Sequence, residues 1–458
     1  MNAIVVSALL GVLMMFVGLF SKNSRQVQWV ALLGITGLMI ASIVDFTHFE
    51  AGHRWFGMIE FTAYTSFFNT VITFCAMMYL FLFHRFIAHT GRHDAEYFAL
   101  IFFVLCGVYL LASYTNLLIL FIGIEILSIP QYILAGSDKE NFKSNEASLK
   151  YFLMGSFSTG ILLMGITLIY GACGTFDVMD PKFIGQFQSL EGMGSLTMVG
   201  ILLLIMSFAF KVSAAPMHLW TADVYDGTPT SFTPFMATIV KVSVFLAFLK
   251  LFHVSFGAVG AAWQVTITAM IALTLLIGNI TAVYQQSVKR MMAYSSIAQA
   301  GFMLFAVFAL NEIAWKGLIL YSAAYTLASL GVFVVLVRMK DFTYDGFNGL
   351  AKRHPLMAAT ATICLLSLAG IPLTGGFFAK FYVLSATLQQ GKMLWLVVFA
   401  VLMAAISAYY YFKVIISMYF NDGESEIVDA PGAPEQALMV INAALVIALG
   451  ILPSLITG

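Results

Sequence analysis

Five ionisable side chains stand inside long apolar stretches, where charged groups are rare. They are one carboxylate and four ammonium groups: Glu125, Lys211, Lys241, Lys380 and Lys413. A charge near the middle of a membrane-spanning helix costs roughly 2.5–3.5 kcal/mol, so pairing or cavity water must offset most of that cost. A buried lysine can have a pKa of about 5–6 and a buried glutamate one of about 8–9. A row of such groups could pass protons along. Lysine suits this role because its pKa moves on burial, whereas arginine stays charged.

The structural alternative is a buried ion pair between Glu125 and one lysine that only fixes helix packing. Such a pair is weak evidence for stability, because apolar residues would pack as well. One carboxylate also cannot neutralise three lysines. Lys413 differs from the others because it lies near the end of its stretch and its side chain could extend to the interface. The candidate proton relay is therefore Glu125, Lys211, Lys241 and Lys380.

A histidine and two aspartates follow Lys211. His218 comes seven residues later and would share its helical face if the helix continued. It is a candidate group for proton uptake or release, with a hydrogen-bonded histidine at the helix end as the alternative. Asp223 and Asp226 come next, at the expected rim of the membrane, where we expect both carboxylates to be solvated.

The composition determines what kind of chain carries these residues. Of 458 residues, 61% are hydrophobic and only 10% are charged, against about 25% charged in soluble domains. This excludes a soluble enzyme, and a formal net charge of zero leaves no basic surface for nucleic acid. The four cysteines lack metal-ligand spacing and are expected to be packing residues. The chain is predicted to be an all-α polytopic membrane protein.

About 20 apolar residues are needed to cross a bilayer as a helix. The apolar runs are uniform rather than alternating, which excludes membrane β-strands. Fourteen stretches qualify or nearly do: 2–20, 27–44, 61–83, 96–113, 115–135, 147–170, 195–220, 230–250, 259–283, 290–310, 313–337, 355–388, 393–420 and 435–456.

Lys and Arg are concentrated in the odd-numbered loops, which predicts that these loops are cytoplasmic and that both termini lie outside. The odd loops contain Lys22, Arg25, Arg85, Arg92, Lys139, Lys143, Lys150, Lys289, Arg290, Arg338, Lys340, Lys352 and Arg353. The even loops contain Arg54, Lys182, Lys250, Lys316 and Lys392. Lys289 and Arg290 are expected to mark a cytoplasmic helix end.

Two spans are predicted to be broken. Pro216 interrupts span 7 and Pro372, among several glycines, interrupts span 12, because proline removes a helical hydrogen bond. Breaks at corresponding places in two halves indicate transporter repeats. The offset of five spans is odd, so spans 4–8 and 9–13 are predicted to be inverted five-helix repeats. The predicted segments are 1–94, 95–255, 256–421 and 422–458.

Several motifs carry a resemblance to a known family. The runs LFIGIEILSIPQYILAG, FKVSAAPMHLWTADVYDGTPT, VKRMMAYSSIAQAGFM and AGIPLTGGFFAKFYV resemble subunit N of bacterial NADH:quinone oxidoreductase, respiratory complex I. This family is antiporter-like and related to Mrp sodium/proton antiporters. The resemblance implies fourteen helices with inverted repeats and assigns the relay to Glu125, Lys211, Lys241 and Lys380. Gln299 departs from the histidine that some relatives carry, which puts a histidine step on helix 10 in doubt.

The resemblance also implies an activity and partners. It implies a proton-translocating membrane-arm subunit of a translocase in a bacterial inner membrane, assembled with other membrane-arm subunits. No glycine fingerprint for a dinucleotide and no cysteine cluster occurs. NADH, FMN, iron–sulfur clusters and quinone are therefore expected in partner subunits, with no cofactor or metal bound by this chain. The alternatives are a subunit of an Mrp-type cation/proton antiporter without a redox partner, and a structural membrane scaffold.

Overall fold

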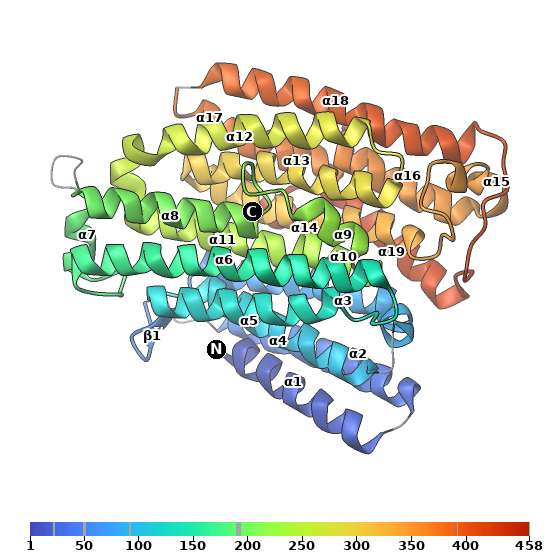
Figure 1. The fold of residues 1–458 in the computed structure, drawn as a ribbon, viewed down its shortest axis with the longest axis horizontal. Coiled ribbons are helices and arrows are strands. Elements are labelled where there is room, and N and C mark those ends of the chain that lie inside the picture. The colour runs from blue at the N-terminus through green and yellow to red at the C-terminus, as the bar shows by residue number, and fades with distance from the viewer. Residues whose placement is uncertain (22, 49–51, 91–92, 189–193, 392, 458) are drawn as a thin grey trace.

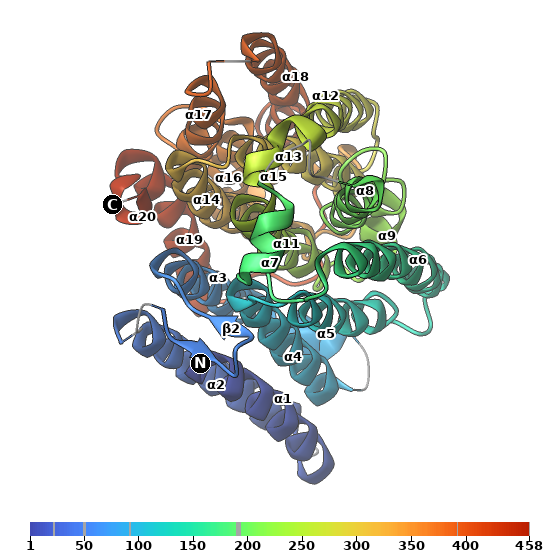
Figure 2. The ribbon, with the colours of Figure 1, turned by 90° about the vertical axis from the view of Figure 1, so that its left-hand side faces the viewer.

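The computed structural model describes residues 1–21, 23–48, 52–90, 93–188, 194–391 and 393–457. Long helices lie side by side along a common axis (Figures 1 and 2), and the predicted all-α class is confirmed. One antiparallel hairpin, β1 (Arg54–Trp55) and β2 (Ile59–Glu60), is the exception among the described residues. Three of the loop charges used to predict orientation, Lys22, Arg92 and Lys392, lie outside the described residues.

The helical elements are, in chain order, α1 (Asn2–Phe20), α2 (Ser24–Thr47), α3 (Ala63–His89), α4 (Asp94–Ser113), α5 (Leu117–Ala135), α6 (Phe142–Cys173), α7 (Pro181–Gln186), α8 (Ser195–Lys211), α9 (Thr221–Gly227), α10 (Thr233–Phe235), η1 (Met236–Val240), α11 (Lys241–Leu251), η2 (Phe252–Phe256), η3 (Gly257–Val259), α12 (Gly260–Val283), α13 (Val288–Ala309), α14 (Glu312–Leu336), η4 (Asp345–Phe347), α15 (Leu350–Arg353), α16 (Pro355–Ala369), α17 (Gly375–Leu388), α18 (Leu394–Tyr419), α19 (Ala433–Ile451) and α20 (Ser454–Thr457). The helices α1 to α18 run from one edge of the bundle to the other, and α19 returns to pack on α3 and α14 (Figure 2).

Each of the fourteen predicted spans has helical structure at its place. Within the described ranges, eleven helical stretches are long and apolar enough to cross a membrane. One of them, Thr233–Val283, contains spans 8 and 9 together. The broken spans 7 and 12 complete the set with the shorter helices α8 and α16. Figure 2 looks along the bundle and places α11 and α14 near its centre, with α1 and α2 at one edge and α18 at the other.

The break in span 7 lies where proline predicted it. α8 ends at Lys211, residues 212–220 are not helical, and α9 resumes at Thr221. Pro216 has no N–H to continue the helical ladder. The indole of Trp220 instead donates to the carbonyl of Phe210 at 3.1 Å. A carbonyl freed at the helix end is thereby satisfied inside the protein, as membrane depth requires.

The break in span 12 depends on two glycines. α16 ends at Ala369, and Gly370 follows with φ of +87°, the left-handed conformation that closes many helices. α17 begins at Gly375. A Cβ atom at Gly376 would overlap the carbonyl oxygen of Ser367. The two halves of span 12 can approach this closely because glycine has no side chain.

The two five-helix repeats pack in matching pairs. α4 packs on α5 as α12 packs on α13, and α6 packs on both halves of span 7 as α14 packs on both halves of span 12. α4 also packs on α11, and α12 packs on α18 in the same relation. This agrees with the inverted repeats predicted from the two breaks. The segment boundaries after residues 94, 255 and 421 stay a prediction.

Loops of the same parity meet at the same end of the bundle. In Figure 1 the β1 hairpin and α7 lie at one end, and α15 lies at the other. Single β-bridges join even loops to one another and odd loops to one another: Ile59 to Tyr114, Asn116 to Asp177, Ser287 to Thr343 and Met339 to Ile427. The predicted alternation of helices is thereby confirmed, whereas the side that faces the cytoplasm stays a prediction.

Ion pairs tie the acidic segment 421–432 to the loop before α16, which yields a pH prediction. Lys352 and Lys340 donate to Asp422 and Glu426, each at 2.6 Å, and these hydrogen bonds lower the pKa of both carboxyl groups below their ordinary values of 3.8 and 4.5. A lowered pKa means that the attachment is present above the ordinary pKa and is lost as pH falls through the lowered one. We expect a spin label at Val428→Cys to become more mobile below about pH 4. A label whose mobility does not change with pH would contradict this.

Candidate functional site

The ammonium of Lys211 contacts the face of α5 that carries Glu125. Glu125 lies in the middle of that helix and accepts a hydrogen bond from Thr159 of α6 at 2.8 Å. The Lys211 ammonium donates to Ser128 at 2.9 Å and to Tyr132 at 3.4 Å. Positions 125, 128 and 132 share one helical face. In the described chain Glu125 forms no ion pair within 4.0 Å, so hydroxyl groups rather than a carboxylate contact this lysine.

A series of aromatic rings in mutual contact leads from Lys211 towards Lys241. Tyr132 contacts Tyr151 with ring centroids 4.8 Å apart, and Tyr151 stacks on Trp220 at 4.6 Å. Trp220 in turn contacts Tyr225 at 5.7 Å, and the Lys241 ammonium lies 5.6 Å from the Tyr225 ring centroid. Phenol hydroxyls can donate and accept, so this wall between the two lysines is partly polar.

Lys241 is 1% exposed and begins α11 directly after the π-helical turn η1. Its ammonium donates to the hydroxyl of Ser296 at 2.9 Å and to the Ser296 carbonyl at 3.1 Å. π-helical turns are rare and often mark functional sites. No pattern in the sequence predicts this π-helical turn. The turn would have been a second signal for Lys241, besides its charge.

Lys380 follows Pro372, whereas Lys211 precedes Pro216. The contacts of the Lys380 ammonium show that the two lysines nevertheless occupy matching places. Lys380 lies in the second half of span 12, but its ammonium reaches back to the carbonyls of Leu368 and Ala369, at 2.9 Å each. These carbonyls end α16, where the helix dipole favours a cation. Lys211 is likewise the last residue of α8. Both lysines therefore lie where the first half of a broken span ends.

Polar side chains of α13 lie between Lys241 and Lys380. Gln299 donates to the Leu368 carbonyl at 3.0 Å, the same oxygen that Lys380 contacts. Gln299 also accepts from Tyr321 and donates to Tyr411 at 3.2 Å. A cavity of about 10 Å³ lined by Gln299, Tyr321 and Lys380 approaches the space that one water needs. Gln299 thus joins the network as an amide.

His218 does not share a face with Lys211. A shared face required a continuous helix, and that condition is not met, because the chain leaves helical geometry after Lys211. His218 is 8% exposed and lies within the break itself. It remains a candidate because it is buried within the break that follows Lys211.

Two lysines and one arginine assigned to loops are buried instead: Lys250, Lys289 and Arg338. Lys250 lies within α11, donates to the Ala112 carbonyl at 3.0 Å and faces the ring of Tyr114. Arg338 is fully buried and pairs at 2.9 Å with Glu435, which opens the last predicted span. Their burial could not be predicted from their positions at the ends of apolar runs, because it is neighbouring elements that cover them.

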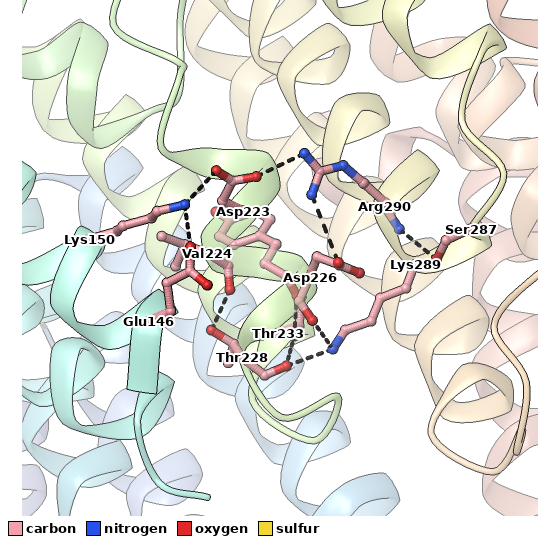
Figure 3. A network of polar contacts seen from close by, with 11 residues as sticks. Glu146, Lys150, Asp223, Val224, Asp226, Thr228, Thr233, Ser287, Lys289 and Arg290 are labelled. Carbon is pink, nitrogen blue, oxygen red and sulfur yellow. Dashed lines mark hydrogen bonds and ion pairs between the residues drawn. The ribbon is translucent and has the colours of Figure 1, made fainter. Parts of the chain in front are cut away.

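Asp223 and Asp226 take part in a charge network at the odd-loop end (Figure 3). Asp223 accepts from Lys150 of α6 at 3.0 Å and from Arg290 of α13 at 2.8 Å. Lys289 donates at 2.7 Å to the backbone carbonyls of both Asp226 and Thr228. The expectation of two simply solvated carboxylates is wrong, because Asp226 also lies 3.8 Å from the Arg290 guanidinium. The network connects α9 with helices of both repeats.

Lys413 is half-buried, with its ammonium 4.0 Å from the centroid of the Tyr344 ring. It therefore makes a surface cation–π contact near the helix end. All four cysteines are buried and unpaired, in agreement with packing residues.

The family follows from comparison with known proteins. Residues 114–407 match the family described as NADH:quinone oxidoreductase/Mrp antiporter, transmembrane. A NADH-quinone oxidoreductase subunit N from Cytophaga hutchinsonii is 39% identical, covering 100% of this chain and 98% of its own length. The chain belongs to the NADH-quinone oxidoreductase subunit N family. A second subunit N, from Trichlorobacter lovleyi, is 36% identical over 99% of this chain and 94% of its own.

Solved structures agree with this membership. A chain of respiratory complex I from Thermus thermophilus with bound aureothin has a TM-score of 0.84 and 28% identity, covering 99% of this chain and 98% of that one. A chain of the Mrp complex from Dietzia sp. DQ12-45-1b has a TM-score of 0.85 over 100% of this chain and 95% of that one. Its identity is 19%, so that likeness concerns the fold alone. The resemblance found in the motifs is thus confirmed for subunit N.

Proposed function

We propose that this subunit N family member moves protons through Glu125, Lys211, Lys241 and Lys380 as part of NADH:quinone oxidoreductase. The observation that carries the proposal is the surroundings of the three lysines. Each ammonium is buried and contacts hydroxyls, carbonyls or rings, with no carboxylate within 4.0 Å in the described residues. A structural ion pair would place a carboxylate there.

The lysines can take part in proton transfer because their positive charge is only partly compensated. A neutral lysine needs no counter-ion, so either protonation state can be populated when a neighbouring charge changes. Hydroxyl groups such as those of Ser128 and Ser296 donate and accept, and can hold a water on either side. Glu125, beside Lys211, supplies the negative charge that favours the protonated lysine. His218 is the proposed group for proton uptake or release.

The energy source and surroundings form the second part of the proposal. Redox chemistry in partner subunits drives the transfer, and this chain has no redox site of its own. NADH, FMN, iron–sulfur clusters and quinone belong to those partners. The chain lies in a bacterial inner membrane next to other membrane-arm subunits, with both termini outside. An Mrp-type antiporter without redox partner is the competing function. A subunit inventory of the purified complex that lacks iron–sulfur subunits would favour it.

Replacing Lys380 tests the relay. Lys380→Ala removes the ammonium from the end of α16, and we expect proton pumping to fall on the order of 100-fold, the range of a lost proton-transfer group. The measurement is ΔpH formation in proteoliposomes containing the assembled complex. Lys413→Ala, a lysine at a surface contact, serves as the matched control and should lose far less. Equal losses for both variants, or none for either, would contradict the relay.

A further inference from the structure

A groove lies where α2, α3 and α19 meet at the odd-loop end of the bundle. It has a volume of about 580 Å³. Its lining combines cations and apolar side chains: Arg25, Trp29, Leu32, Phe81, Arg85 and Leu438. None of the relay residues contributes to it, so the proton path leaves this feature unexplained.

The groove has an excess of positive charge. Glu435 at its wall accepts from Arg85 at 2.7 Å with one oxygen and from Arg338 at 2.9 Å with the other. The backbone N–H of Gly432 also donates to Glu435, at 3.2 Å. Two guanidinium groups therefore share one carboxylate whose oxygens are both occupied, and the charge of Asp429 also acts on both of them. Arg25 adds a further cation, and it has no ion-pair partner in the part of the chain that the structure describes.

The rest of the groove is mostly apolar, with Gln28 and His84 as further polar lining. Trp29 is 56% exposed on α2, one turn from Arg25. Tryptophan is typical of the membrane interface, where an apolar ring lies next to polar headgroups. Leu32 and Phe81 continue the wall beyond it. Cations at the mouth and hydrocarbon below match the two parts of a phospholipid, and basic pockets between transmembrane helices commonly bind anionic headgroups.

We propose that this groove binds one phospholipid with an anionic headgroup. Arg25 and Arg85 contact the phosphate, and an acyl chain lies along Trp29 and Phe81. A free phosphate ion would not contact the apolar wall. A partner transmembrane helix would leave the Arg25 charge without a counter-ion at the rim.

The test uses the assembled complex, depleted of lipid and then incubated with photoactivatable phosphatidylglycerol or phosphatidylcholine. We expect phosphatidylglycerol to label peptides of α2 and α3, and phosphatidylcholine to label them much less. Arg25→Gln should reduce the phosphatidylglycerol labelling about fivefold, equivalent to about 1 kcal/mol for one basic residue at the surface. Arg25 makes no ion pair that folding would lose, so the variant should assemble.

Two controls make the result decisive. Arg353→Gln changes an arginine at the same end of the bundle, in α15 and outside the groove, and labelling should be unchanged. Inorganic phosphate at millimolar concentration should not displace the lipid. Equal labelling by both lipids, or no effect of Arg25→Gln, would overturn the proposal. Displacement by phosphate would instead indicate a simple anion site, and labelling only after removal of a neighbouring subunit would indicate a protein interface.

Discussion

Lys211→Ala is expected to reduce proton pumping by the assembled complex on the order of 100-fold, the range for loss of a group that transfers protons. The ammonium of Lys211 ends α8 and contacts Ser128 and Tyr132 on the face of α5 that carries Glu125. Alanine removes the titratable group at the break in span 7 and leaves Glu125 without its cationic neighbour. The measurement is the proton gradient formed per NADH oxidised, in proteoliposomes.

The substitution Lys211→Arg separates charge from titration. Arginine keeps the positive charge but does not release its proton in proteins, so we expect pumping to remain low although the charge is restored. Lys352→Ala, which removes an exposed lysine paired with Asp422, is the control for lysine loss in general. Pumping that survives Lys211→Ala in a normally assembled complex would favour the scaffold alternative. Recovery with arginine would mean that a fixed charge is sufficient.

Glu435→Ala is expected to lower the free energy of unfolding by about 3–5 kcal/mol, the cost of leaving a buried charge without its partner. Arg338 is 0% exposed and pairs with Glu435, while stacking its guanidinium 4.6 Å from the ring of Phe86. The same carboxylate also pairs with Arg85, so α3, α19 and the turn after α14 lose a common contact. The measurement is a denaturation curve of the detergent-solubilised protein.

A second substitution identifies the cause. Arg338→Met combined with Glu435→Ala removes the buried cation together with its partner, and should recover most of the stability because no unpaired charge remains. Glu426→Ala, at an exposed pair with Lys340, should leave the stability nearly unchanged, because water screens such pairs. A double variant as unstable as Glu435→Ala would show that packing, rather than the unpaired charge, accounts for the loss.

Local sequence properties predicted the architecture and the first candidates. Hydrophobicity over about 20 residues is sufficient to locate a span, and all fourteen spans are present. Pro216 and Pro372 located both breaks, because the lack of an N–H acts within one helical turn. Glu125, Lys211, Lys241 and Lys380 were found because a charge contrasts with the apolar residues beside it in the chain.

The surroundings of those charges were decided by contacts between residues far apart in sequence. The Lys380 ammonium returns to the end of α16, and Lys241 contacts Ser296 across the bundle. Lys250 and Arg338 lie near the ends of apolar runs, where the sequence cannot distinguish a solvated loop from a helix end covered by its neighbours. Composition and spacing thus determined which segments cross the membrane, because those properties act locally. Tertiary structure alone decided which charges are buried and what they contact, because burial depends on elements that the chain brings together only on folding.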